Sequence, residues 1–179
     1  MLILFDASTA LRLHAVSLLR LCFFTFLIVS GSATGSGAEI SLRSEPTLKK
    51  VTIRKQIRSA QGMLRKETDG TFFVEVVRDM QGIEKGLSHR ESMPEAHGML
   101  FVLDPSQEHA FWMKGMRFAL DIIFIGGDMQ LTEILENLQP CERCPVYFPK
   151  GQPAYALELN AGIARKYSLS VGDTMVLEK

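Results

Sequence analysis

Short apolar runs separated by turn-forming residues are the feature that most constrains how this chain folds. From residue 71 onward, such runs stand at 71–77, 99–103, 110–113, 120–125, 129–135, 154–159 and 174–177. Gly, Pro and Asp residues, which favour turns, lie between most of them. Runs of this length and spacing predict strands, and only two short helical pieces, at 79–86 and 161–167, interrupt them.

This pattern predicts a single mainly β domain, an antiparallel β-sandwich or barrel with one or two short helices. Within it, Gly126-Gly127-Asp128 tolerates positive φ, so we expect a hairpin turn between the flanking strands. Asp79 is the expected N-cap of the first helical piece, which ends at Gly86. Long helices alternating with strands, which would indicate a parallel α/β fold, are not part of the pattern.

Residues 1–38 have the pattern of a secretory signal peptide. Arg12 and Arg20 form a basic region, residues 21–30 are almost entirely apolar, and Ser36-Gly37-Ala38 matches a cleavage site between small residues. An uncleaved anchor is the alternative, but a membrane span needs about 20 apolar residues and Arg20 interrupts the run. We therefore expect cleavage after Ala38 and a periplasmic or secreted protein, which is membrane-associated only if the signal is retained.

Residues 39–69 indicate a basic linker or arm that precedes a folded domain at 70–179. Its excess of Lys and Arg would attract anionic lipid headgroups, but a solvated tether is the simpler interpretation. Val51 and Ile53 alternate with polar residues, so the pattern allows one short strand there. Over the whole chain, 20 Lys and Arg balance 20 Asp and Glu, which gives no overall attraction to nucleic acid.

Two cysteines, Cys141 and Cys144, remain after loss of the signal. In an oxidising compartment they predict a disulfide. A redox pair would need a thioredoxin-like context, and a zinc site would need two further ligands; neither is visible, so a loop-stapling disulfide is the favoured interpretation. The remaining histidines are scattered without metal-ligand spacing, and we expect neither a metal nor a cofactor.

The densest group of residues that could bind a ligand lies at 109–121. On a strand, Trp112 and Lys114 share a face, and an exposed ring beside a cation is suited to sugars or small polar ligands. The alternative is that Trp112 fills the core. Asp121 opens an apolar strand, so it needs a partner, for which Arg90 and Lys114 are candidates. It would then be either half of an ion pair or a general base.

Several segments, taken in order, resemble one family. They are Lys85-Gly86-Leu87, Gly98-Met99-Leu100-Phe101-Val102, Phe111-Trp112-Met113-Lys114, Leu120-Asp121-Ile122-Ile123-Phe124-Ile125, the Cys pair before Pro145 and Tyr147, Leu157-Glu158-Leu159 with Gly162, and Gly172-Asp173. Over roughly residues 71–178 the chain resembles the exported bacterial and archaeal proteins called domain of unknown function 192. The resemblance implies a jelly-roll-like β-sandwich and a signal peptide, but no assigned activity.

The chain departs from that family pattern at a few positions. Ser88 stands where the family usually has Met, Gly115-Met116 replace Asn-Thr, and Ala119 replaces Pro. The last two departures flank the segment that carries Trp112 and Lys114, so the details of a family site there would be altered.

Our leading functional hypothesis is a non-catalytic binding module at the cell envelope for a small polar ligand or glycan. Its candidate ligand-binding residues are Trp112, Lys114, Asp121, Arg90 and Glu158. A hydrolase of envelope material, with Asp121 or Glu158 as general base, is the first alternative, and two facing carboxylates would favour it. A structural partner of another envelope protein is the second, and a flat exposed apolar patch would favour that.

Overall fold

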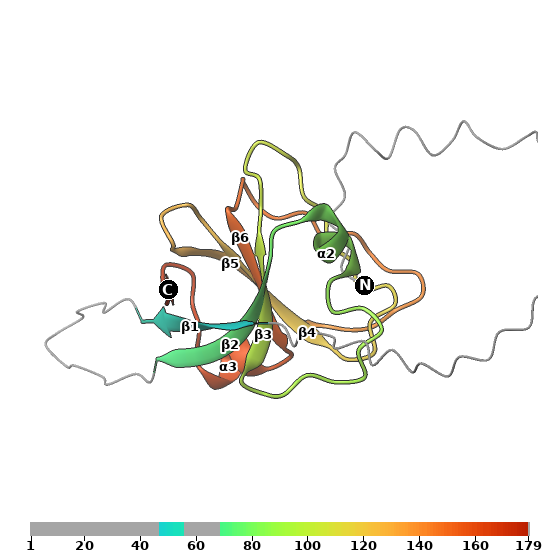
Figure 1. The fold of residues 1–179 in the computed structure, drawn as a ribbon, viewed down its shortest axis with the longest axis horizontal. Helices are drawn as coiled ribbons and strands as arrows, with labels where there is room; N and C mark the ends of the chain where they lie inside the picture. Colours follow the sequence, from blue (N-terminus) through green and yellow to red (C-terminus); the bar gives the residue numbers. More distant parts are fainter. Residues whose placement is uncertain (1–46, 56–68, 179) are drawn as a thin grey trace, which may run out of the picture.

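In the part of the chain that the structure describes, seven strands pair edge to edge in one sheet, and two short helices lie against it (Figure 1). The computed structural model describes residues 47–55 and 69–178. The strands are β1 (Leu48–Arg54), β2 (Gly70–Val77), β3 (His97–Val102), β4 (Leu120–Ile125), β5 (Leu131–Leu138), β6 (Tyr155–Asn160) and β7 (Thr174–Leu177). The helices are α2 (Met80–Lys85) and α3 (Ile163–Lys166). The described part of the chain is therefore mainly β with two short helices, as the sequence predicts.

The strand order is β5-β4-β6-β3-β2-β1-β7, and one neighbouring pair breaks the expected antiparallel pattern. All pairs are antiparallel except β2 and β3, which run parallel. The prediction of a wholly antiparallel arrangement is wrong at this pair. Its reason is the connection: the chain leaves β2 through α2 and crosses back before it enters β3, as a parallel pair requires.

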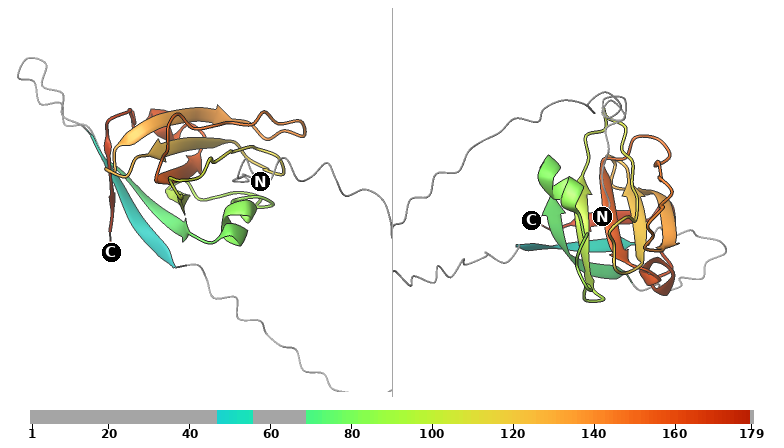
Figure 2. Two further views of the ribbon diagram at one scale, coloured as in Figure 1. Left: turned by 90° about the horizontal axis from the view of Figure 1, so that it is seen from above. Right: turned by 90° about the vertical axis from the view of Figure 1, so that its right-hand side faces the viewer.

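The sheet is curled into a half-barrel. Figure 2 shows β1 and β2 turned out of the plane of β4 and β5. At one end the two sheet edges meet, because Gln130 forms an isolated bridge with Thr174 and the Leu131 N–H donates to the Asp173 carbonyl over 2.8 Å. A single curled sheet, rather than two separate sheets, thus supplies the faces on which the core packs.

Two segments of the described chain bear on predicted strands. β1 lies inside the sheet between β2 and β7, at the position in the predicted basic arm where the sequence allows one short strand. Residues 110–113 form no regular strand; there, Phe111 makes only a bridge to Tyr147. The predicted signal peptide, the start of the arm and residues 56–68 lie outside the described residues.

Apolar side chains pack on both faces of the central strands. All six residues of β4 are therefore buried, rather than every second one. One face, here the α2-side core, is covered by α2 and by the segments before β4 and after β5. The other, the α3-side core, is enclosed by the curl and by α3. The α2-side core includes Ile83, Leu87, Met99, Phe101, Phe111, Met113, Ile122 and Phe124, and the α3-side core includes Val51, Phe72, Val74, Leu100, Ile123, Leu157, Leu159 and Ile163.

Local capping sets the position of α2. The Asp79 side chain accepts a hydrogen bond from the Gly82 N–H over 2.8 Å, as the predicted N-cap should. Gly86 ends the helix at φ 48°, a conformation that favours glycine. Since the helix stops there, residues 87–90 run on across the α2-side core and carry Arg90 onto that face. Among the described helices, none has the length and apolar character that a membrane span requires.

Candidate functional site

Glu158 is the least expected residue of the core. It lies in the middle of β6 with no exposed surface, and both of its carboxyl oxygens are buried without a hydrogen-bond partner in the described part of the chain. Strand register sets four residues in one row across β2, β3, β6 and β4: Glu75, Met99, Glu158 and Ile122. Because Met99 and Ile122 belong to the α2-side core, the Glu158 carboxyl points to that side.

Arg90 and Glu75 form a bidentate ion pair on this same face. Arg90 Nη1 donates to Glu75 Oε1 over 2.5 Å and Nη2 donates to Oε2 over 2.8 Å. This pair is partly exposed, with 36% of the Arg90 side chain and 19% of the Glu75 side chain open to solvent. Glu75 and Glu158 are two strands apart in the row, about 10 Å between backbones. Glu75 is not among the ligand-binding residues that the sequence predicted.

Burial controls the charge of Glu158. Desolvation raises the pKa of its carboxyl to about 8, and the nearby positive charge of Arg90 lowers it again by a smaller amount. The pKa of Arg90 is itself raised, first by the hydrogen bond to Glu75. At neutral pH the Glu158 carboxyl is therefore mainly protonated, and it can donate one hydrogen bond as well as accept others.

Asp121 is buried on the opposite face. It pairs across the sheet with Leu159, which belongs to the α3-side core, so its side chain points away from Glu158. Its Oδ1 accepts from the Asn137 N–H and its Oδ2 from the Ala164 N–H, each over 2.8 Å. The expectation that Arg90 or Lys114 pairs with Asp121 is thus wrong. Both oxygens hold backbone groups of β5 and α3, which is a structural role.

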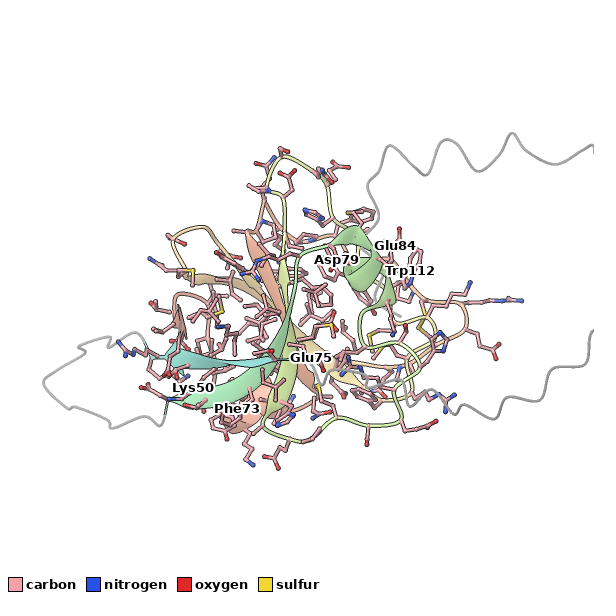
Figure 3. The ribbon with its side chains drawn as sticks, in the orientation of Figure 1. Lys50, Phe73, Glu75, Asp79, Glu84 and Trp112 are labelled. Carbon is pink, nitrogen blue, oxygen red and sulfur yellow. A yellow bond between two sulfur atoms is a disulfide. The ribbon has the colours of Figure 1, made fainter. Side chains whose placement is uncertain are left out.

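Trp112 and Lys114 lie on an extended segment over the α2-side core. Phe111 and Met113 point into that core, so Trp112 and Lys114 alternate outward, as the period of two predicts. Trp112 is half-buried and Lys114 is exposed. Figure 3 shows Trp112 near the α2 end of the molecule and Glu75 well away from it on the sheet. Of the five predicted ligand residues, the structure brings only Arg90 and Glu158 together.

The two cysteines form a staple in the segment that follows β5. Cys141 and Cys144 are joined in a disulfide with 5.3 Å between their Cα atoms, and both pack against the α2-side core. Cys141 also bridges to Lys114, which ties this segment to the one that carries Trp112. Within residues 47–55 and 69–178, no three His, Cys, Asp or Glu side chains gather closely enough to hold a metal ion.

These features define a small mainly β domain with a buried titratable group on one face of a curled sheet. The family described as "Uncharacterized ACR", domain of unknown function 192, matches residues 62–177, and the chain belongs to it. The predicted resemblance to this family is therefore confirmed, whereas the predicted export is not tested by the match. No curated protein matches this chain.

Two solved structures are similar to this protein. One is a protein of unknown function from Novosphingobium aromaticivorans DSM 12444, with 25% identity, a TM-score of 0.64, and coverage of 82% of this chain and 99% of that one. The other is a Sinorhizobium meliloti 1021 protein described as "a putative transcription regulator", with 27% identity, a TM-score of 0.61, and coverage of 73% and 93%. Both likenesses support the curled-sheet fold.

Proposed function

We propose that this protein binds a small polar ligand on the α2-side face of its sheet, with Glu158 and Arg90 as the contacting residues. The observation that carries the proposal is the Glu158 carboxyl, which is fully buried without a hydrogen-bond partner among the described residues. Buried polar groups are normally paired, and leaving one unpaired costs about 1–3 kcal/mol. A ligand that forms a hydrogen bond with this carboxyl would explain why a polar group is buried at a position where the fold gives it no partner among the described residues.

The charges of the site favour an uncharged or cationic ligand. With a pKa of about 8, the Glu158 carboxyl at neutral pH presents a donor and an acceptor, which complement an amide, a hydroxyl or an amine. The positive charge of Arg90 is already compensated by Glu75. An anionic ligand would therefore meet no uncompensated positive charge between these residues.

A thermal-shift panel of amino acids and amines tests the proposal, because a ligand at 100 times its dissociation constant adds about 2.7 kcal/mol to stability. Glu158→Leu should abolish the shift while the variant itself melts higher, since it loses an unpaired buried carboxyl. The matched control is Glu84→Leu, which removes an exposed carboxylate on α2 (Figure 3) and should keep the shift. A shift that survives in Glu158→Leu would contradict the site.

We also propose that the protein acts outside the cytoplasm, at the cell envelope. The support is the signal-like pattern of residues 1–38 and the disulfide between Cys141 and Cys144, a bond that oxidising compartments preserve. N-terminal sequencing of material from the periplasmic or secreted fraction should return Glu39 or a residue close to it. Recovery of intact Met1 from the cytoplasmic fraction would contradict export.

A hydrolase is the second candidate function, but the roles of its acidic residues differ from those predicted from the sequence. Asp121 is excluded as a partner of Glu158 because it points to the other face and holds two backbone amides. Glu75 shares the face of Glu158, and a carboxyl with a pKa of about 8 suits a general acid rather than a base at neutral pH. Turnover of chromogenic glycosides or esters that is lost in Glu158→Gln would favour this candidate over simple binding.

A further inference from the structure

A hollow of about 220 Å³ opens on the surface between two loops, away from Glu158. One wall is the loop after β3, with Ser106, Gln107, Glu108 and His109; the other is the segment before β6, with Phe148, Pro149, Gly151, Gln152 and Pro153. Of these residues, only His109 lies in the segment 109–121 that the sequence suggested for ligand binding. The volume is below the range of about 300–1,000 Å³ that holds drug-sized ligands, so the hollow suits one small ring.

The loop after β3 is held in shape by its own hydrogen bonds. Asp104 Oδ1 accepts from the Ser106 N–H and hydroxyl, and its Oδ2 accepts from the Gln107 side-chain amide. The hydrogen bond from the Ser106 hydroxyl is the main reason that the pKa of Asp104 is lowered. His109 is buried, and its Nε2 donates to the Asp104 carbonyl over 2.8 Å.

The opposite wall is anchored on both sides of Phe148. Tyr147 exchanges two backbone hydrogen bonds with Phe111, at 2.8 and 2.9 Å, and the Lys150 N–H donates to the buried Glu133 carboxylate over 2.7 Å. Phe148 itself is 62% exposed, the highest fraction among the large hydrophobic residues that the structure describes. An aromatic ring held on a fixed backbone yet left open to solvent is a ready platform for an apolar ligand face.

The polar groups around that ring select the ligand class. Gln107 and Gln152 carry amides, which both donate and accept, and Glu108 adds a negative charge to the lining. Among residues 47–55 and 69–178, no Lys or Arg lines the hollow, so phosphates and carboxylates would meet no counter-charge from this part of the chain. A pyranose ring combines an apolar C–H face, which would lie on the Phe148 ring, with hydroxyls that both donate and accept.

From this combination we infer that the hollow beside Phe148 is a saccharide-binding site for a neutral sugar unit. The Phe148 ring stacks on the sugar face, and the amides of Gln107 and Gln152 bind its hydroxyls. The inference does not rest on Glu158, which lies in the core on β6 rather than in this lining. The aromatic residue that contacts the sugar is thus Phe148, whereas the sequence suggested Trp112 for this role.

Titration of the full ¹⁵N-labelled chain with maltotriose and with the N-acetylglucosamine trisaccharide tests the inference by NMR. At millimolar saccharide, the amide signals of residues 106–109 and 151–152 should shift together. Phe148→Ala should weaken the affinity by about tenfold or more, whereas Phe73→Ala, which truncates an exposed ring on β2 (Figure 3), should leave it within about twofold. Unchanged far-UV circular dichroism of both variants shows that the fold is kept.

Three outcomes would overturn the inference: no shift of these signals with either saccharide, equal affinity in Phe148→Ala, or shifts produced by spermidine and not by the saccharides. The last outcome would indicate a cation held by Glu108 and the ring instead. Glu158→Leu should bind the saccharides as well as the unaltered chain does. Failure of the Glu158 proposal is thereby distinguishable from failure of this one.

Discussion

Two buried carboxyls in one sheet show how different the roles of chemically similar residues can be. Asp121 and Glu158 are both without exposed surface, and they point to opposite faces. Asp121 accepts two backbone hydrogen bonds, so its burial is compensated. Glu158 has no such partner among the described residues, and burial raises its pKa to about 8. Asp121 therefore stabilises the fold, whereas Glu158 destabilises it when its carboxyl is ionised.

The Glu158 titration makes stability depend on pH. Its carboxyl has a pKa of about 8 in the folded protein against 4.5 as the reference value, so between these values the folded state holds a proton that the unfolded state has lost. Stability from this group is thus present at low pH and falls as pH rises from about 5 to 8, by at most about 1.4 kcal/mol per pH unit. Urea unfolding at pH 5, 6, 7 and 8 should show this slope, and Glu158→Gln should remove it. Equal slopes in both proteins would contradict the assignment.

Replacement of Asp121 by Asn tests the structural role of the second carboxyl. An amide has a single acceptor oxygen, so either the Asn137 or the Ala164 N–H is left facing an NH₂ group. Asp121→Asn should therefore lower the free energy of unfolding by about 1–3 kcal/mol. The control is Asp128→Asn in the exposed hairpin turn, where the change should stay within about 0.5 kcal/mol. A fully stable Asp121→Asn would mean that these two bonds are dispensable.

At the scale of the elements, the close approach of β3 to β6 depends on one glycine. A Cβ at Gly98 would lie 2.6 Å from the Glu158 carbonyl oxygen and 2.7 Å from Leu159 Cδ2. The first contact is with backbone, which cannot move aside without disturbing the pairing of the two strands. A residue without a Cβ is therefore needed where β3 pairs with Leu159 of β6.

Gly98→Ala should destabilise the protein by about 1–3 kcal/mol, the usual cost of forcing extra atoms into a packed core. Gly127→Ala is the matched control, because no atom lies within 4 Å of a Cβ built there, and its effect should stay within about 0.5 kcal/mol. Urea denaturation of the two variants measures the difference. Equal stability of the two alanine variants would show that β3 and β6 can separate without cost.

At the scale of the whole molecule, the two cores share their supporting strands. β3, β4 and β6 each place residues in both the α2-side core and the α3-side core. Loss of one core would leave the same strands with one face unsupported, so the two should not unfold separately. The bridge between Gln130 and Thr174 adds a link between the sheet edges.

Unfolding in urea should therefore be a single transition. The fluorescence of Trp112, the one tryptophan of the chain, reports on the segment over the α2-side core, and far-UV circular dichroism reports on the entire sheet. The two midpoints should coincide. A fluorescence change that precedes the loss of dichroism would show that the covering segments detach while the sheet persists.

The sequence by itself determined the features that depend on neighbours in the chain. The strand at 174–177, the hairpin around Gly126-Gly127-Asp128 and the Asp79 cap of α2 all follow from local periodicity, turn chemistry or a short-range hydrogen bond. The family could also be predicted from the sequence, because the segments typical of that family occur in this chain in the expected order. Alternation likewise predicted that Trp112 and Lys114 share a side.

Only the tertiary structure decided which distant segments meet. The parallel pairing of β2 with β3 and the place of β1 between β2 and β7 depend on long-range pairing that no local pattern encodes. Asp121 finds its donors at Asn137 and Ala164, while Glu158 finds none among the described residues, and the sequence presents both simply as acids within apolar strands. The physical reason is that a strand's period of two tells which residues share a face, whereas hydrogen-bond partners and burial are set by the elements that pack against that face.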